Sequence, residues 1–149
     1  MRAFLMIGFL TVAVPDRPDP TPKEAATRSL HEQIQGDWQV VASTAGGSPN
    51  TTIAAGRATF RFDGDKMILR LDPGGPPYNY QFWIESTKSP AFFDFAMGKA
   101  GQKNAGIVKI EGDVLTICYL YSNQKGRPTE FVSPAGSSSA VWQMRRIKK

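Results

Sequence analysis

The sequence GIVKIEGDVLTICY, residues 106–119, decides the fold class. On both sides of Glu111-Gly112-Asp113, apolar residues alternate with other residues at a period of two, which is typical of a strand with one buried face. A glycine between two carboxylates is a common composition for a tight turn. We therefore predict two antiparallel strands, residues 105–111 and 114–121, joined by this turn.

Similar short runs, separated by Gly, Pro, Asn and Asp, continue in both directions. Phe62-Asp-Gly-Asp-Lys66 predicts a second tight hairpin. The expected strands are residues 37–43, 57–63, 66–71, 78–86, 91–97, 105–111, 114–121 and 140–147. Because these strands do not alternate with helices, they predict an all-β fold, an antiparallel meander closed as a barrel or folded as a sandwich. One-sided apolar alternation favours a single sheet that wraps around its own core.

The N-terminal end has the pattern of an export signal. Met1-Arg2 precedes an apolar run at residues 3–14, which is too short to span a bilayer comfortably. We expect residues 1–14 to be a signal peptide or anchor, and the protein to be exported with no stable membrane span after cleavage. An N-terminal core strand is the alternative. The Pro- and Asp-rich residues 15–22 read as a linker, and residues 23–149 as the barrel domain.

A short helix is expected between the linker and the first strand. Thr21 is suited to an N-cap, with Pro22 and Glu24 completing the start signal. An apolar residue then recurs every fourth position up to Ile34, and Gly36 ends the pattern. We expect this helix to lie against the barrel or to plug it.

Composition and charge exclude several classes of protein. The chain has 149 residues, 41% hydrophobic and 21% charged, which fits one folded domain and not a wholly disordered chain. Arg145, Arg146, Lys148 and Lys149 supply four positive charges, and subtracting them from the net +5 leaves +1 for the rest. A charge confined to the terminus favours a solvated strand end over a nucleic-acid surface. We therefore expect no nucleic-acid partner.

The single cysteine excludes an intrachain disulfide and any multi-cysteine metal site. Cys118 lies opposite the apolar register of its strand, and we expect it to be buried, beneath the N-terminal helix, rather than paired between molecules. The single histidine, His31, has no signalled nucleophile beside it and reads as a surface residue. Asp63, Asp65 and Asp113 are turn residues with no metal-loop spacing. No catalytic set, metal or cofactor is expected.

The inward face of the predicted sheet is aromatic. Its candidate ligand-binding residues are Trp38, Phe60, Tyr78, Tyr80, Phe82, Tyr119 and Tyr121. A buried tyrosine hydroxyl needs a partner or water, so the interior is either a hydrated ligand cavity or a filled core with tyrosines at the mouth.

Arg127 and Glu130 bracket Pro128-Thr129 beyond the seventh strand. Arg127 is able to grip an anionic ligand, because a guanidinium binds a carboxylate through two hydrogen bonds. The alternative is an internal pair of Arg127 with Glu130 that fixes the loop returning to the last strand.

Gly36-Asp-Trp38 resembles the G-x-W signature of lipocalins, in which the tryptophan closes the barrel floor beneath a basic residue of the last strand. Arg145 or Arg146 would take that basic role. The wider order of motifs resembles the lipocalin-like domain family of uncharacterised exported bacterial proteins, abundant in planctomycetes. The matching segments are Gly36-Asp-Trp38-Gln-Val40-Val41, Phe62-Asp-Gly-Asp-Lys66, Lys88-Ser-Pro-Ala-Phe-Phe-Asp94, residues 106–118 and Arg127-Pro-Thr-Glu-Phe131. The resemblance implies an eight-stranded lipocalin-like barrel and no activity.

The function expected from the sequence is non-enzymatic binding of a small apolar or amphipathic molecule inside the barrel, by an exported protein. A structural or protein-interaction domain of the cell envelope with a filled core is the first alternative. An enzyme that uses the barrel-mouth tyrosines with Asp94 and Arg127 is the second.

Overall fold

The structure, a computed structural model, describes residues 28–97 and 101–148. The predicted signal or anchor, the linker and the predicted helix start at Thr21 lie outside these described residues. The elements are α2 (Leu30–Ile34), β1 (Gly36–Ala45), β2 (Ser48–Pro49), β3 (Thr59–Asp63), β4 (Lys66–Arg70), β5 (Tyr78–Glu85), β6 (Ala91–Ala96), β7 (Asn104–Glu111), β8 (Val114–Leu120) and β9 (Ser139–Arg146). In the described residues, no helix has the length and apolar character needed to cross a membrane.

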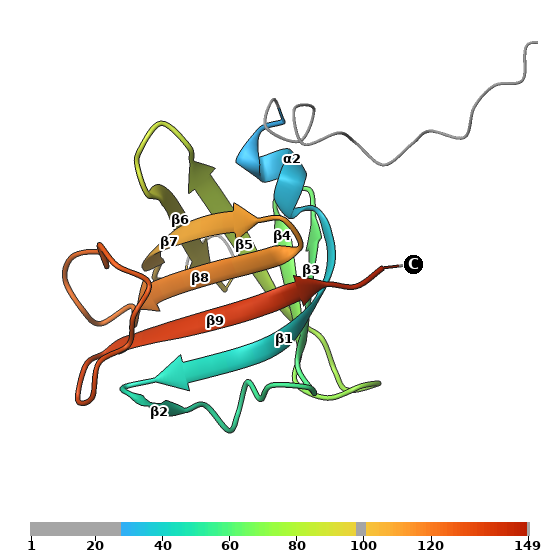
Figure 1. Cartoon of the computed structure of the whole chain (residues 1–149), viewed down its shortest axis with the longest axis horizontal. Helices are drawn as coiled ribbons and strands as arrows, with labels where there is room; N and C mark the ends of the chain where they lie inside the picture. Colours follow the sequence, from blue (N-terminus) through green and yellow to red (C-terminus); the bar gives the residue numbers. More distant parts are fainter. Residues whose placement is uncertain (1–27, 98–100, 149) are drawn as a thin grey trace, which may run out of the picture.

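The strands form one closed antiparallel barrel (Figure 1). Each strand from β3 to β8 pairs with the next in the chain, β1 pairs with β3, and β1 also pairs with β9, which closes the sheet. The eight-stranded up-and-down barrel is therefore confirmed, and the sandwich is excluded. The two-residue strand β2, which pairs with the end of β1, was not predicted, because two residues are too few to show alternation.

Both predicted tight turns are present. Asp63 pairs with Lys66 across the β3–β4 turn, and Glu111 pairs with Val114 across the β7–β8 turn. Gly64 at φ +60° and Gly112 at φ +61° occupy the left-handed region, where a glycine avoids the strain that a side chain would bring.

The interior is filled by large side chains from every part of the barrel wall. The largest fully buried ones on the strands are Trp38, Phe60, Phe62, Phe82, Phe93, Met67, Leu115, Ile117 and Met144, and β7 contributes the smaller Val108. The rings contact one another: Phe62 lies 5.2 Å from Phe82, and Phe82 lies 5.6 Å from Phe93, between centroids. The one-sided alternation thus predicts the inward face correctly, and this face is an aromatic core.

Helix α2 lies across one end of the barrel (Figure 1). Within the described residues it spans a little more than one turn. Ser29 is its N-cap and accepts a hydrogen bond from Glu32 N at 3.2 Å. Its last residue, Ile34, is fully buried, and its first residue, Leu30, packs on the core. The helix therefore lies against the barrel end, as expected, but it begins only at Leu30, because Ser29, which the predicted helix would include, has an extended backbone. The opposite end of the barrel includes the start of β5 and the end of β8.

Candidate functional site

The end covered by α2 is built around Trp38 and Arg146. The indole of Trp38 is fully buried, and its Nε1 donates to Ile34 O at 2.8 Å. The Arg146 guanidinium lies 4.2 Å from the centroid of the Trp38 ring and donates to Gln35 O at 2.8 Å and to Gln33 O. Burial lowers the pKa of Arg146 from its ordinary value. Arg146, on the last strand β9, therefore contacts both helix α2 and Trp38 on the first strand β1.

Of the two arginines expected to pack on Trp38, Arg146 does so and Arg145 does not. Arg145 pairs with Gln39 on the outward face of the sheet and is exposed. Gly36 has φ +112°, and a Cβ at this position would lie 3.4 Å from Arg146 Nη1. The positive φ therefore favours a glycine at the turn between α2 and β1, whereas the distance to the guanidinium is an ordinary contact.

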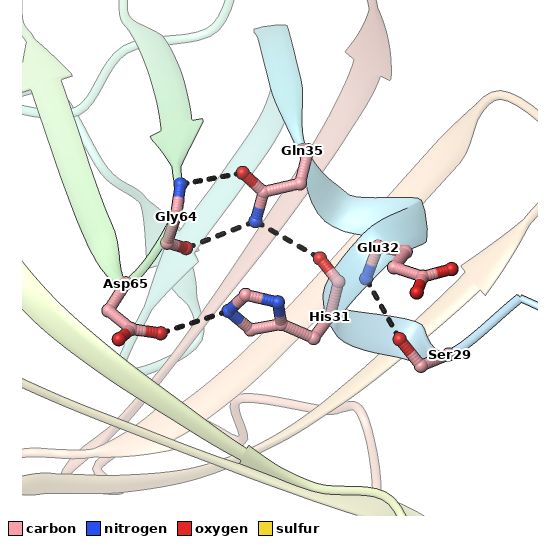
Figure 2. Close-up of polar contacts among 6 residues, drawn as sticks. All are labelled: Ser29, His31, Glu32, Gln35, Gly64 and Asp65. Atoms are coloured by element: carbon pink, nitrogen blue, oxygen red, sulfur yellow. Dashed lines mark hydrogen bonds and ion pairs between the residues drawn. The ribbon is translucent and has the colours of Figure 1, made fainter.

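Helix α2 is also fixed to the β3–β4 turn, as Figure 2 shows. Gln35 Oε1 accepts from Gly64 N at 2.7 Å, and Gln35 Nε2 donates to Gly64 O at 3.1 Å and to His31 O at 3.0 Å. His31 Nε2 lies 3.1 Å from Asp65 Oδ1, and its ring stacks on Phe82 at 5.5 Å between centroids. These contacts give His31 a structural role at the end of the barrel.

Three predicted ligand-binding residues lie deep in the filled interior. Trp38, Phe60 and Phe82 are at most 1% exposed. Phe60 lies 4.8 Å from Trp142, and Phe82 contacts other phenylalanine rings. Close packing of this kind stabilises the barrel, and these three side chains act as the support of the site rather than as its surface.

The end opposite α2 carries a continuous row of rings, which we call the aromatic row: Tyr80, Phe95, Tyr119 and Tyr121. The centroid separations along it are 5.7 Å, 4.9 Å and 5.8 Å. It crosses from β5 through β6 to β8 and rests on Trp142, which lies 4.6 Å from Tyr119 and 5.4 Å from Phe95.

Exposure increases along the aromatic row from its centre to its edge. Tyr119 is 7% exposed and Tyr80 is half-buried, whereas Tyr121 is 40% exposed. Tyr78, on the same strand as Tyr80, is 39% exposed. Burial raises the pKa of Tyr119 and of Tyr80, which moves their ionisation further above neutral pH, where both hydroxyls are hydrogen-bond donors in any case.

Tyr78 and Tyr121, expected inside the barrel, instead lie at its rim. Tyr78 is the first residue of β5, and Tyr121 directly follows β8. Alternation assigns a side chain to a face of the sheet but not to a depth along the barrel, and residues at strand ends meet solvent.

Arg127, expected as an anchor within the barrel, lies on the outer wall. Its Nη1 donates to Asp94 Oδ1 and, at 2.6 Å, to Gly106 O, and its guanidinium lies 4.0 Å from the Phe92 ring centroid. Asp94 and Phe92 alternate with the inward Phe93 on β6, so they face outward. Arg127 therefore does not reach a ligand held inside the barrel.

These contacts fix the return loop, residues 121–138, to the barrel. The loop-fixing alternative for Arg127 is thus the observed arrangement, but its carboxylate partner is Asp94 and not the predicted Glu130, which is exposed. The same geometry separates the groups of the enzyme alternative: Asp94 and Arg127 contact each other on the outer face of β6, whereas Phe95 and the aromatic row occupy its inner face.

The predicted burial of Cys118 is confirmed. Its Sγ donates to Val132 O at 3.5 Å, so the return loop contacts it, and not the N-terminal helix as expected. Burial raises the pKa of the Cys118 thiol to about 11. At neutral pH the thiol is protonated and behaves as a small apolar group with a weak donor.

Three residues have structural roles that were not predicted from the sequence: Asp94, Phe95 and Trp142. Phe95 joins the two tyrosine-bearing strands within the aromatic row, and Trp142 supports it from β9. The sequence does contain the pattern that indicates them: Phe93-Asp94-Phe95 alternates, and Trp142 shares its face with Met144.

In residues 28–97 and 101–148 no group of three or more His, Cys, Asp or Glu side chains is placed to hold a metal ion. Comparison with protein-family models, curated proteins and solved structures finds no match to this chain.

Proposed function

We propose that this protein is an exported, lipocalin-like binding protein that holds a small apolar or amphipathic molecule at the end of its barrel away from α2, without catalysing a reaction. The aromatic row carries this proposal. Four rings in contact run from the buried Phe95 and Tyr119 to the exposed Tyr121 at the end away from α2, so the outer part of the row offers an aromatic surface with phenolic hydroxyls.

The depth of the site follows from the filled interior. Because Phe60 and Phe82 are fully packed, a ligand rests above Tyr119 and Phe95 rather than deep in the barrel. Its apolar part covers the rings, and its polar part reaches the hydroxyls of the rim tyrosines, Tyr78 and Tyr121. The arrangement of Trp38 with Arg146 at the other end supports the lipocalin-like reading, since that family closes its barrel in this way.

The second candidate is a structural or protein-interaction domain. The observation that favours it is the core itself, in which rings contact one another from Phe62 through Phe93 and Phe95 to Trp142. A barrel filled in this way is a stable module on its own, and the rim tyrosines would then contact a protein partner.

A neutral fluorescent amphiphile, N-phenyl-1-naphthylamine, separates the two candidates. We expect saturable binding to the intact chain, weakened about tenfold when Tyr78 and Tyr121 are both changed to alanine, because two rings of contact are lost. Trp83→Ala is the matched control: Trp83 is also 40% exposed but faces the outer wall opposite Asp94, so binding stays unchanged.

Absence of saturable binding, or equal weakening by Trp83→Ala, would reject the binding proposal. Native mass spectrometry of the purified protein adds an independent reading, since a resident ligand appears as a discrete added mass that the double tyrosine variant lacks.

A further inference from the structure

A cavity of about 210 Å³ lies on the outer wall of the barrel, away from the aromatic row. Its walls come from β1, β3, β4 and the residue that follows β9: Asp37, Thr59, Phe60, Arg61, Ile68, Arg70 and Ile147. Ile147 N donates to Asp37 O at 2.9 Å, which extends the β1–β9 pairing past the end of β9 and holds Ile147 in place as a wall. We call this site the arginine cavity.

Two guanidinium groups and one carboxylate line the arginine cavity. Arg61 Nε donates to Asp37 Oδ1 at 2.9 Å, so this pair is internally balanced. Arg70 donates to the backbone oxygen of Gly75, and among the described residues no carboxylate lies within ion-pair distance of it. The cavity therefore has one positive charge that a carboxylate of the described chain does not neutralise.

The register of β3 and β4 sets the spacing of the two arginines. Arg61 pairs with Ile68, and Thr59 pairs with Arg70, so the arginines are diagonal neighbours on the outward face. Diagonal neighbours lie about 7–8 Å apart at their Cα atoms, a distance that one carboxylate group bridges easily between two long side chains.

Apart from Thr59, the rest of the lining is apolar. Ile68 lies on β4, directly opposite Arg61 and two residues before Arg70, and Ile147 is 40% exposed. A volume of about 210 Å³ is below the range typical of drug-sized ligands, about 300–1,000 Å³. One net positive charge, two branched apolar walls and a small volume together describe a small organic anion with one charge and a short apolar body.

We propose that the arginine cavity binds a small organic monocarboxylate, whose carboxylate contacts Arg70 and whose apolar chain lies against Ile68 and Ile147. Guanidinium groups suit this task because they present paired N–H donors that match the two carboxylate oxygens. This site is separate from the aromatic row, and it does not depend on the function proposed above.

The test is a titration of the ¹⁵N-labelled chain with hexanoate, followed by the backbone amide shifts. We expect saturable shifts centred on residues 59–61, 68–70 and 147. Hexanamide has the same chain without the charge and should bind about tenfold more weakly, because it loses the charge-assisted hydrogen bonds. Inorganic phosphate, which lacks the apolar body, should also bind more weakly than hexanoate.

Arg70→Gln removes the charge and keeps a donor for Gly75 O, and it should weaken hexanoate binding about tenfold. Arg57→Gln is the matched control. Arg57 is also an arginine on this side of the barrel, but it pairs with Asp72 at 3.0 Å and does not line the cavity. It should leave hexanoate binding unchanged.

Equal binding of hexanoate and hexanamide, unaltered binding to the Arg70→Gln variant, or phosphate binding as tight as that of hexanoate would overturn the proposal. So would shifts that centre on Tyr78 and Tyr121, which would place the carboxylate at the end away from α2 instead. Failure here leaves the binding of a neutral amphiphile at the aromatic row as a separate question with its own result.

Discussion

Replacing Arg146 by alanine should destabilise the barrel strongly. The guanidinium makes two hydrogen bonds to backbone oxygens, those of Gln33 and Gln35, and lies 4.2 Å from the Trp38 ring centroid. A hydrogen bond from a charged group contributes about 1.5–3 kcal/mol, and a cation over an indole contributes about 0.5–2 kcal/mol. Because Arg146 is only partly buried, water reaches the two oxygens in the variant, so we expect the low end, about 3.5 kcal/mol in the free energy of unfolding.

Two further variants separate charge from geometry. Arg146→Lys keeps the positive charge but has one compact ammonium group in place of a planar fork, so it should lose about half of that free energy. Arg145→Ala is the matched control, because Arg145 is the adjacent exposed arginine on the outward face, and its removal should change stability by less than about 0.5 kcal/mol.

Urea unfolding at pH 7, followed by tryptophan fluorescence, measures all four proteins. A common dependence of the free energy on urea concentration shows that the variants unfold in the same way. If Arg146→Ala and Arg145→Ala had the same small effect, Arg146 would not join α2 to the barrel. Full retention of stability in Arg146→Lys would reduce the interaction to charge alone and contradict the role of the planar guanidinium.

Three other results are expected. In a double-mutant cycle, Arg127→Ala and Asp94→Ala should couple by about 1–2 kcal/mol in unfolding free energy, whereas Arg127→Ala and Glu130→Ala should be additive; the reverse would mean that Glu130 fixes the return loop. Burial raises the pKa of Cys118 from its ordinary 9.0 to about 11, so above pH 9 the unfolded chain releases a proton that the folded chain retains. Unfolding free energy should therefore fall from pH 9 towards pH 11, and less steeply in Cys118→Ala; an unchanged slope would mean that the thiol is not buried. Gly36→Ala should lower the thermal midpoint by straining a backbone at φ +112°, with a cost of about 1–3 kcal/mol, and a variant as stable as the parent would refute that strain.

The sequence predicts most of the barrel because the relevant signals are local. A period of two and a glycine-centred turn are visible within the β7–β8 hairpin alone, and the same signals recur along the chain. The sequence also contains the information needed to decide which of Arg145 and Arg146 packs on Trp38. Trp142, Met144 and Arg146 share one face of β9, so the arginine on the core side is the one that meets Trp38.

The position of Arg127 was not predictable in the same way. Its partner Asp94 lies 33 residues earlier in the chain, and the return loop that carries Arg127 has no periodicity to indicate which face of the barrel it covers. The two rim tyrosines, Tyr78 and Tyr121, were misplaced for a related reason: periodicity identifies a face, whereas the depth of a residue depends on where the closed barrel ends.

The central claim is that the aromatic row is a binding surface for an apolar or amphipathic molecule. Intermolecular nuclear Overhauser effects between decanol, a neutral amphiphile, and the ring protons of the tyrosines test it most directly. We predict such effects from the decanol chain to the rings of Tyr78, Tyr119 and Tyr121. Their absence at saturating decanol, or effects confined to the ring of Trp83 on the outer wall, would contradict the claim.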